Sequence, residues 1–321
     1  AFAGCILGLS DGETYDVRLT VDEPGQSVVT VTGTQSTRAL PATAGTPNKT
    51  ATPATLTAQL ATLVAGDVLE LEAGTYAAFT LAEAKSGSSG SPIYIRGASR
   101  TGTIVSASSG AAVTWASSHV VLENMTIEGS GSDGGTGSGS VGIVFSTGLS
   151  SPQTNPTIRN ITATGFDRFC KGYEPVNGRL VYNCTIAGNN TWSMTYGTPI
   201  SLTWNDDGVS GPGEGNCFFD SAITGHGDTL KLGSSSGTFY SAAVFMYRVA
   251  CDSTGDDFAE FDDGSGNMAV YDCYVKNAGT GFSVDGIYGG PVYFARNRVG
   301  NLSRHSIKIT SDSQNVAVYS N

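Results

Sequence analysis

Two short stretches in the second half of the chain concentrate residues that can move protons or bind a cation. The stretch 227–233, "GDTLKLG", carries one lysine, and the stretch 255–264, "GDDFAEFDDG", carries five carboxylates. Both alternate apolar and polar residues, as strands do when they bury one side. Carboxylates can bind divalent cations or act as general acids and bases, and a lysine can act as a base.

The same alternation recurs further along the chain. The aligned segments are Leu230-Lys231-Leu232, Ala259-Glu260-Phe261, Phe282-Ser283-Val284 and Ile307-Lys308-Ile309. If the apolar residues point inward, Lys231, Glu260, Ser283 and Lys308 form one outward column. Neighbouring strands lie about 4.8 Å apart, so Lys231 should contact Glu260 and lie about 14 Å from Lys308.

This stacking gathers many carboxylates on one face. They are Asp206, Asp207, Asp228, Asp257, Glu260, Asp262 and Asp285. Close carboxylates repel one another unless a cation or a lysine offsets their charge. The alternative is a simple surface ion pair between Lys231 and Glu260, worth less than about 1 kcal/mol.

One chemistry that fits is glycoside hydrolysis. One carboxylic acid would protonate the glycosidic oxygen and another would attack or activate water, and a separation of about 5 Å or of about 6.5–9.5 Å would imply retention or inversion. The candidate catalytic carboxylates are Asp207, Asp257, Glu260 and Asp262.

The other chemistry is a lyase reaction on a uronate sugar. Carboxylates from Asp206, Asp228 and Asp285 would hold Ca²⁺, the one cofactor indicated, and Lys231 would remove the proton next to the carboxylate. Lys308 and Arg304 are the alternative bases and candidate substrate-binding residues. Glu260 opposes a lowered pKa of Lys231 unless Ca²⁺ occupies the acid.

The longest insertion, residues 188–215, contains three aromatic residues close to the acidic cluster. Trp192, Tyr196 and Trp204 precede Asp206. Long loops on rigid scaffolds often carry function, so these side chains are candidate substrate-binding residues that stack on sugar rings. The alternative is that they pack the loop onto the scaffold.

The elements that must position these residues are short repeated strands. From about residue 113 an apolar-x-x-polar-x-x-apolar unit recurs, with its fourth position near Asn124, Asn160, Asn183, Asp220, Met246, Asp272 and Arg296. Such a period indicates a solenoid, and alternating strands with one polar turn residue per coil predict an all-β parallel β-helix. A ladder of Asn side chains would satisfy backbone groups at the bend.

The remaining chain divides into three parts. Residues 1–37 read as strands, and "GLSDGETYDVRLTV" resembles the late strands of a fibronectin type III domain, with Tyr15 at its buried tyrosine. Residues 38–53 form a Pro/Ala/Thr-rich linker. The solenoid takes 54–321 and begins with a short capping helix, for which Thr52 is the expected cap. Its last repeat is unfinished at residue 321, so further coils are expected.

The solenoid resembles the right-handed parallel β-helix superfamily of pectate, alginate and chondroitin lyases, polygalacturonases and phage tailspikes. The motifs are "GDVLELEAGTY", "SPIYIRG" and, later, "NDDG", "GDTLKL", "EFDDG" and "YGGPVY". The later set is similar to an uncharacterised bacterial secreted subgroup. The resemblance implies an extracellular protein that processes polysaccharides.

Composition limits the partners. The 321 residues carry a formal net charge of -11, which argues against nucleic acid or an anionic membrane as the main partner. No apolar run approaches the roughly 20 residues of a membrane span. A polysaccharide or cell-surface glycan is the expected ligand. The rivals are a glycan-binding adhesin or trimeric tailspike module on a virion tail, and a structural spacer.

Overall fold

The computed structural model divides into two compact units, one ending at Thr43 and one running from Ala44 to Asn321. The structure describes residues 6–129, 140–166, 168–172, 175–188, 209–210, 213–232, 241–262, 266–286, 290–310 and 313–321. The large unit holds the residues of chemical interest that the structure describes.

The small unit contains an antiparallel hairpin of β1 (Thr14–Val21) and β2 (Val29–Ser36). Tyr15 is half-buried, and its hydroxyl accepts a hydrogen bond from the Ser10 N–H at 2.8 Å. One side of the hairpin is apolar and open to solvent, with Leu19 and Val31 both exposed. The fibronectin type III assignment stays a prediction, since two strands do not define that fold.

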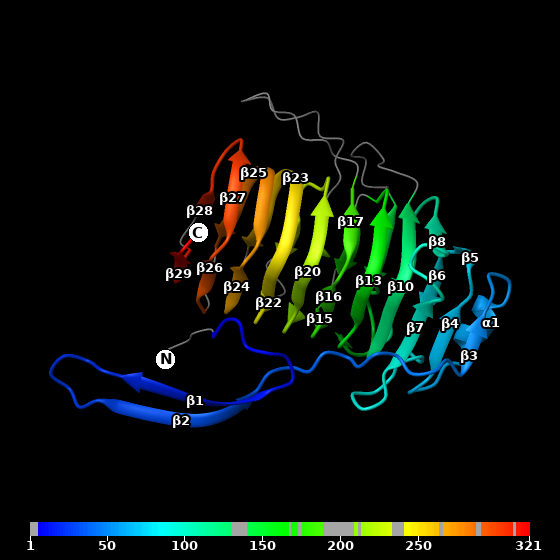
Figure 1. Cartoon of the computed structure of the whole chain (residues 1–321), viewed down its shortest axis with the longest axis horizontal. Helices are drawn as coiled ribbons and strands as arrows, with labels where there is room; N and C mark the ends of the chain where they lie inside the picture. The colour runs from blue at the N-terminus through cyan, green and yellow to red at the C-terminus, as the bar shows by residue number, and fades with distance from the viewer. Residues whose placement is uncertain are drawn as a thin grey trace. The chain divides into compact units, whose positions relative to one another are not determined.

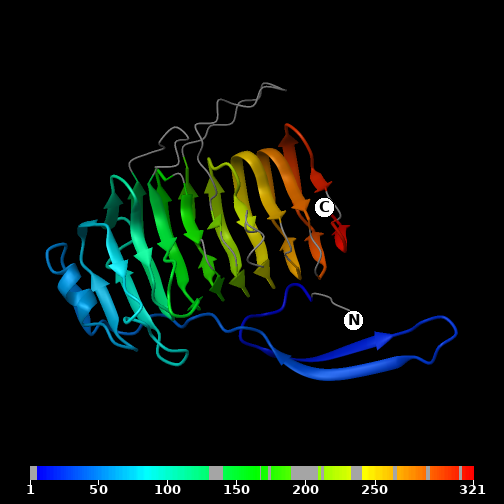
Figure 2. The same ribbon diagram turned by 180° about the vertical axis from the view of Figure 1, so that it is seen from behind.

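The large unit is a parallel β-solenoid whose coils follow one another in sequence order (Figure 1). The helix α1 (Leu56–Ala61) lies at one end of the stack, and the last strands lie at the other (Figures 1 and 2). Successive strands on each face pair in parallel, because every coil returns to the same direction.

Three faces run the length of the solenoid. The first is built by β3 (Lys49–Ala51), β4 (Val68–Leu71), β7 (Ile93–Gly97), β16 (Leu180–Tyr182), β24 (Met268–Tyr271), β26 (Val292–Ala295), β29 (Val316–Tyr319) and the first halves of β10 (Val120–Gly129), β13 (Thr157–Thr164), β20 (Cys217–Thr224) and β23 (Phe245–Asp262). The strand β3 lies within the segment 38–53 that was expected to be a linker.

The second face joins the later parts of those long strands to β5 (Gly74–Ala77), β8 (Thr103–Ala107), β17 (Thr185–Ala187), β27 (Arg298–Leu302) and the start of β25 (Tyr274–Asp285). Two small sheets pair β12 (Gln153–Thr154) with β15 (Val176–Asn177) and β19 (Gly213–Glu214) with β22 (Ser241–Ala242).

The third face consists of β6 (Phe79–Leu81), β9 (Ala111–Trp115), β11 (Val141–Phe145), β14 (Arg168–Gly172), β18 (Val209–Ser210), β21 (Leu230–Leu232), β28 (Ile307–Thr310) and the ends of β23 and β25. This face carries the candidate functional residues.

The corner between the first and second faces needs a residue with positive φ in each coil, and Asn tolerates that conformation better than most residues. Asn124, Asn160 and Asn183 have φ of 58°, 52° and 53°. Asn160 donates to the side chain of Asn124 at 2.9 Å, so the predicted ladder forms. The prediction of Met246 for this position is wrong: it lies inside the core, and Arg248 occupies the corner with φ of 50°.

Aliphatic and aromatic side chains fill the interior of the solenoid. Phe261, Phe282 and Phe294 are almost fully buried and stack on one another between coils, with ring centroids 4.5 Å apart for Phe282 and Phe294. Cys184 and Cys273 are buried too, as expected for small residues in a stack. Burial raises the pKa of both thiols to about 12, so they are inert.

The helix α1 closes the first coil with apolar residues. Leu56, Leu60 and Leu63 are buried, as their spacing predicts. The expected cap is wrong: Thr55 is the N-cap, and Thr52 precedes it in a tight turn. Within the described ranges, none of the helical structure is both long and apolar enough for a membrane crossing.

Candidate functional site

The strands of the third face place one polar residue from each coil in a column, as the alternation predicts. Lys231 pairs in register with Glu260, Glu260 with Ser283, and Ser283 with Lys308. The column extends upstream through Ser210 to Lys171. We call Lys171, Ser210, Lys231, Glu260, Ser283 and Lys308 the Lys231 column.

The flanking residues of these strands anchor the column. Leu230, Ala259, Phe261 and Phe282 are all at most 2% exposed and point into the core. Because side chains alternate along a strand, the residues between them face outward. The rigid core therefore fixes the position of the column.

Lys231 contacts two carboxylates. Its ammonium forms a short ion pair with Glu260 Oε2 and lies 3.4 Å from Asp228 Oδ2. The lysine side chain is 40% exposed, whereas that of Glu260 is only 14% exposed. The ammonium group is thus reachable from solvent, whereas the two carboxylates that it contacts are largely buried.

Asp257 completes the acidic cluster. Carboxylate oxygens of Asp228, Asp257 and Glu260 all lie within 4.8 Å of one another. Asp257 is 3% exposed, and its backbone N–H donates to Asp228 Oδ1 at 2.9 Å. Its Oδ1 is buried and has no hydrogen-bond partner. A buried acceptor of this kind is costly unless something satisfies it.

A bulge in β23 brings these residues to the site. The pairing of β23 with β25 shifts register between Thr254 and Asp257, where β23 has one residue more than β25. Bulges re-aim side chains and are frequent beside active sites. The extra residue lies in the Gly-Asp-Asp sequence, so Asp256 and Asp257 enter different surroundings.

The electrostatics of Asp257 follow from its burial. Desolvation raises the pKa of the Asp257 carboxyl above its usual range, and the neighbouring charges of Asp256 and Glu260 act in the same direction. A hydrogen bond with Thr280 and the charge of Lys308 oppose the increase in pKa. A second cation near this carboxylate would stabilise its charged form.

The remaining predicted residues of the described chain lie around this cluster. Lys308 is half-buried at the downstream end of the column. Arg304 forms a 2.6 Å ion pair with Asp256. Asp285 pairs in register with Asp262. The side chain of Asp262 is not among those that the structure describes. Asp285 is not in the trio of close carboxylates.

Five predicted residues fall outside the residues that the structure describes. They are Asp206, Asp207, Trp192, Tyr196 and Trp204. Their roles as metal ligands, catalytic acid and sugar-stacking aromatics remain predictions.

Sequence reasoning missed Lys171. This half-buried residue is in the column, two coils before Lys231. A signal was present, since "RFCKG" places a lysine directly after a buried residue, as "TLKLG" does. The insertion 188–208 separates the two coils and obscured the alignment.

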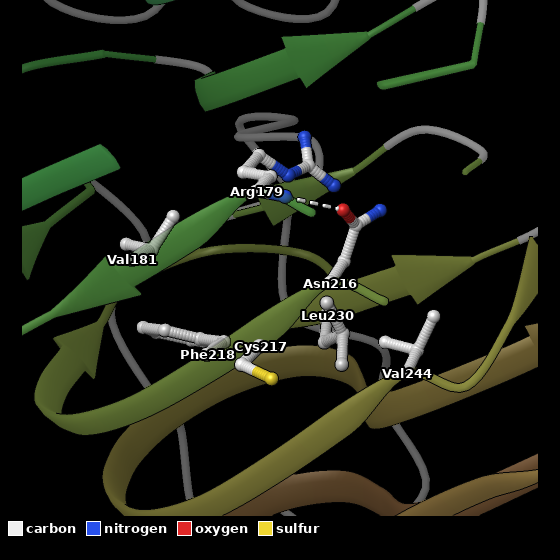
Figure 3. A pocket seen from close by; sticks show the side chains of 7 residues that line it. All are labelled: Arg179, Val181, Asn216, Cys217, Phe218, Leu230 and Val244. Atoms are coloured by element: carbon white, nitrogen blue, oxygen red, sulfur yellow. Dashed lines mark hydrogen bonds between the residues drawn. The ribbon is translucent and has the colours of Figure 1, made fainter. Parts of the chain in front are cut away.

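The interior below β21 contains a small cavity lined by Arg179, Asn216, Leu230 and other buried residues (Figure 3). The Asn216 side-chain oxygen accepts a hydrogen bond from the Arg179 backbone N–H at 2.7 Å. The cavity measures about 10 Å³, which is room for one water molecule and not for a sugar.

Comparison with known proteins identifies the fold. No protein-family model matches the chain, and a search of curated proteins finds no significant match. Solved structures do match. An alginate lyase from Paenibacillus sp. str. FPU-7 has a TM-score of 0.50 at 14% identity, over 84% of this chain and 95% of that one.

Two further matches have similar scores. Pectate lyase Pel9A has a TM-score of 0.53 at 15% identity, over 84% of this chain and 78% of that one. A rhamnogalacturonan lyase has a TM-score of 0.54 at 16% identity, over 77% and 69%. Identities this low show the fold alone. The chain is a right-handed parallel β-helix, which confirms the parallel solenoid that the repeats predict and the handedness that the resemblance implies.

Proposed function

We propose that the protein is a cation-dependent lyase of acidic polysaccharides, with its site at Lys231, Asp228, Asp257 and Glu260. The observation that carries the proposal is a trio of close carboxylates, two of which form ion pairs with one solvent-accessible lysine. Several structural neighbours are polysaccharide lyases, which supports polysaccharide processing at a general level.

The donor set fits a hard divalent cation such as Ca²⁺. Ca²⁺ prefers carboxylate oxygens, and the trio offers three. The buried Oδ1 of Asp257 has no hydrogen-bond partner, so this member of the trio has an acceptor that a cation would satisfy. When bound, the cation would neutralise the acids and draw the carboxylate of a uronate sugar to the site.

Lys231 is the group best placed to remove a proton. In β-elimination the base takes the proton from the carbon that bears the uronate carboxylate. The electron pair of that C–H bond forms the new double bond, and the glycosidic oxygen leaves with the neighbouring sugar. Lys231 then carries the proton, and the leaving oxygen takes one from solvent. Glu260 and Asp228 position Lys231 through ion pairs, which favour its ammonium form. With these acids bound to a cation, the lysine would lose that interaction, which would favour the neutral amine that accepts the proton.

A retaining glycoside hydrolase is the second candidate. Carboxylate oxygens within 4.8 Å of one another are closer to the separation of about 5–5.5 Å in retaining enzymes than to that of inverting ones. Burial raises the pKa of Asp257, which suits a general acid. The lysine inside the acidic cluster favours the lyase.

We further propose an extracellular location, because polysaccharides of this kind lie outside the cell. A glycan-binding adhesin or tailspike module remains the rival, and it would bind the same glycans without cleaving them. A measured homotrimer together with binding alone would favour a tailspike.

The test is a panel of polygalacturonate, alginate and neutral glucan, each incubated with Ca²⁺ or with EDTA. The lyase produces an unsaturated sugar end that absorbs in the ultraviolet, whereas a hydrolase produces only reducing ends. Loss of a general base typically lowers the rate by about 10²–10⁴-fold, so we expect that effect from Lys231→Ala and a strong loss from Glu260→Gln.

A matched ion pair provides the control. Lys276 and Asp252 lie 3.7 Å apart on the second face, and both are about half exposed. Lys276→Ala should leave cleavage unchanged. Full activity of both Lys231→Ala and Glu260→Gln would disprove the proposed site, and reducing ends without unsaturation would favour the hydrolase.

A further inference from the structure

The Lys231 column concentrates the lysines of the chain. The sequence contains six lysines: Lys49, Lys85, Lys171, Lys231, Lys276 and Lys308. Three of the six, Lys171, Lys231 and Lys308, occupy positions that a continuous chain of register pairs connects. In a protein with a net charge of -11, this concentration forms a line of three lysines, the lysine track, in which Glu260 is the one acidic column member.

The track has a defined direction and length. Each register pair moves about 4.8 Å along the solenoid axis, so Lys171 lies two steps, or about 10 Å, before Lys231. Lys308 lies three steps, or about 14 Å, beyond it. A ligand that meets all three lysines must therefore be a polymer that extends parallel to the axis.

The two ends of the track differ in their neighbours. Ser210 occupies the column position between Lys171 and Lys231, whereas Glu260 and Ser283 occupy the positions between Lys231 and Lys308. The downstream end also contains the buried Asp257, and the charge of Lys308 acts on that carboxylate. The positive charge of Lys308 therefore already stabilises a carboxylate of the protein itself.

Strand β14 contributes more than one cation. Arg168 begins this strand and is half-buried, like Lys171 three residues later. Guanidinium groups suit carboxylates because they present several donors in a plane. The upstream end of the track therefore has the side chains needed to bind an anion.

We propose that Lys171, supported by Arg168, forms an upstream subsite for a carboxylate of the glycan. The glycan is a polyuronate that lies along the third face, with one uronate at β14 and the reacting sugar at Lys231. This inference rests on the proposed function for the position of the reacting sugar, but binding at β14 needs no catalysis. Lys171 is then a positioning residue that selects long anionic chains.

Binding measurements test the subsite directly. Affinity electrophoresis in gels containing polygalacturonate, alginate or neutral glucan reports binding without cleavage when the gels contain EDTA. A hydrogen bond to a charged group is worth about 1.5–3 kcal/mol, so Lys171→Ala should weaken polyuronate binding by about tenfold or more. Lys171→Glu should weaken it further, and Lys171→Arg should retain it.

The matched control is Lys276→Ala, which removes a half-exposed lysine from the second face and should leave binding unchanged. Chain length provides a second readout. For the active protein, the Lys171→Ala defect should appear in KM on long substrates and vanish on oligosaccharides too short to reach β14. A structural defect would instead lower activity on all lengths.

The outcomes separate this inference from the proposed reaction. If the protein binds polyuronates in a Lys171-dependent manner and cleaves none of them, the subsite stands and the lyase proposal fails. If Lys171→Ala and Lys171→Glu fold and bind long polyuronates as the unaltered protein does, the subsite is disproved. Equal loss of binding to neutral glucan would also overturn it.

Discussion

Asp257 shows at the level of one residue how the site opposes stability. The carboxylate is almost fully buried, has acids for neighbours and leaves one oxygen without a hydrogen-bond partner. A residue chosen only for stability would be neutral here. Groups that destabilise the fold are common at functional sites, where activity outweighs the loss.

Asp257→Asn should therefore raise the melting temperature near pH 7 in EDTA. The folded-state pKa of Asp257 is raised, so the folded protein holds the proton more tightly than the unfolded chain does. The ionised carboxylate destabilises the fold above that pKa. The destabilisation disappears as the pH falls below the unfolded value of about 3.9.

The gain from Asp257→Asn should accordingly shrink between neutral pH and about pH 4 when thermal unfolding is followed at both values. Asp256→Asn is the control, because Asp256 is half exposed and paired with Arg304. A lower melting temperature for Asp257→Asn at neutral pH would contradict the account.

The corner turn between the first and second faces connects each coil to its neighbours through side chains. Asn160 has positive φ, donates to Asn124, and accepts from Arg100 Nη1 at 3.2 Å. Arg100 also donates to Thr162 Oγ1 at 2.8 Å and to the Ile161 carbonyl at 2.8 Å. One corner thus joins three neighbouring coils through side chains.

Asn160→Ala should destabilise the protein more than Asn160→Gly. Both remove the side-chain hydrogen bonds, but only alanine adds the left-handed backbone penalty of about 1–2 kcal/mol. Urea denaturation of the two variants measures the difference. Equal stability, or a more stable alanine variant, would mean that the corner does not retain its positive φ.

The sequence specifies these elements unevenly. The alternation around Lys231, Glu260, Ser283 and Lys308 predicts their register, because apolar residues can face only the core. Ser283 departs from expectation: it is outward by alternation, yet fully buried. Such burial depends on packing between coils, which periodicity does not encode.

The missed residues have a related cause. The repeat alignment assigns the corner to Met246, which is two residues too early. Phe219 pairs with Tyr247, so the corner falls at Arg248. Lys171 was missed because insertions change the number of residues per coil. Register follows hydrogen bonds between coils, so spacing along the chain alone does not reveal it.

At the scale of the whole molecule, chemistry and core belong to one unit. The apolar core of the large unit is continuous along the coils, and every contact described for the site lies within Ala44–Asn321. The hairpin β1–β2 forms a unit of its own. Solenoid stability is approximately a sum over neighbouring coils, so the large unit should fold without the hairpin.

A chain that starts at Ala44 should therefore retain the far-ultraviolet circular dichroism of the solenoid and its binding of polyuronates. We expect the affinity to stay within about twofold, because no site contact is removed. Comparative affinity electrophoresis of the full and shortened chains measures this. Loss of binding with intact β structure would assign a direct role to the first unit.

The stacked register of the third face makes the solenoid a ruler graduated in coils. Distances between groups in the Lys231 column are whole multiples of one strand separation, about 4.8 Å. A polymer whose charged groups recur at another interval can meet only some of the lysine positions. Inserting one coil between β14 and β18 would move Lys171 by one graduation, and so change which polymer it matches, without altering the surroundings of Lys231.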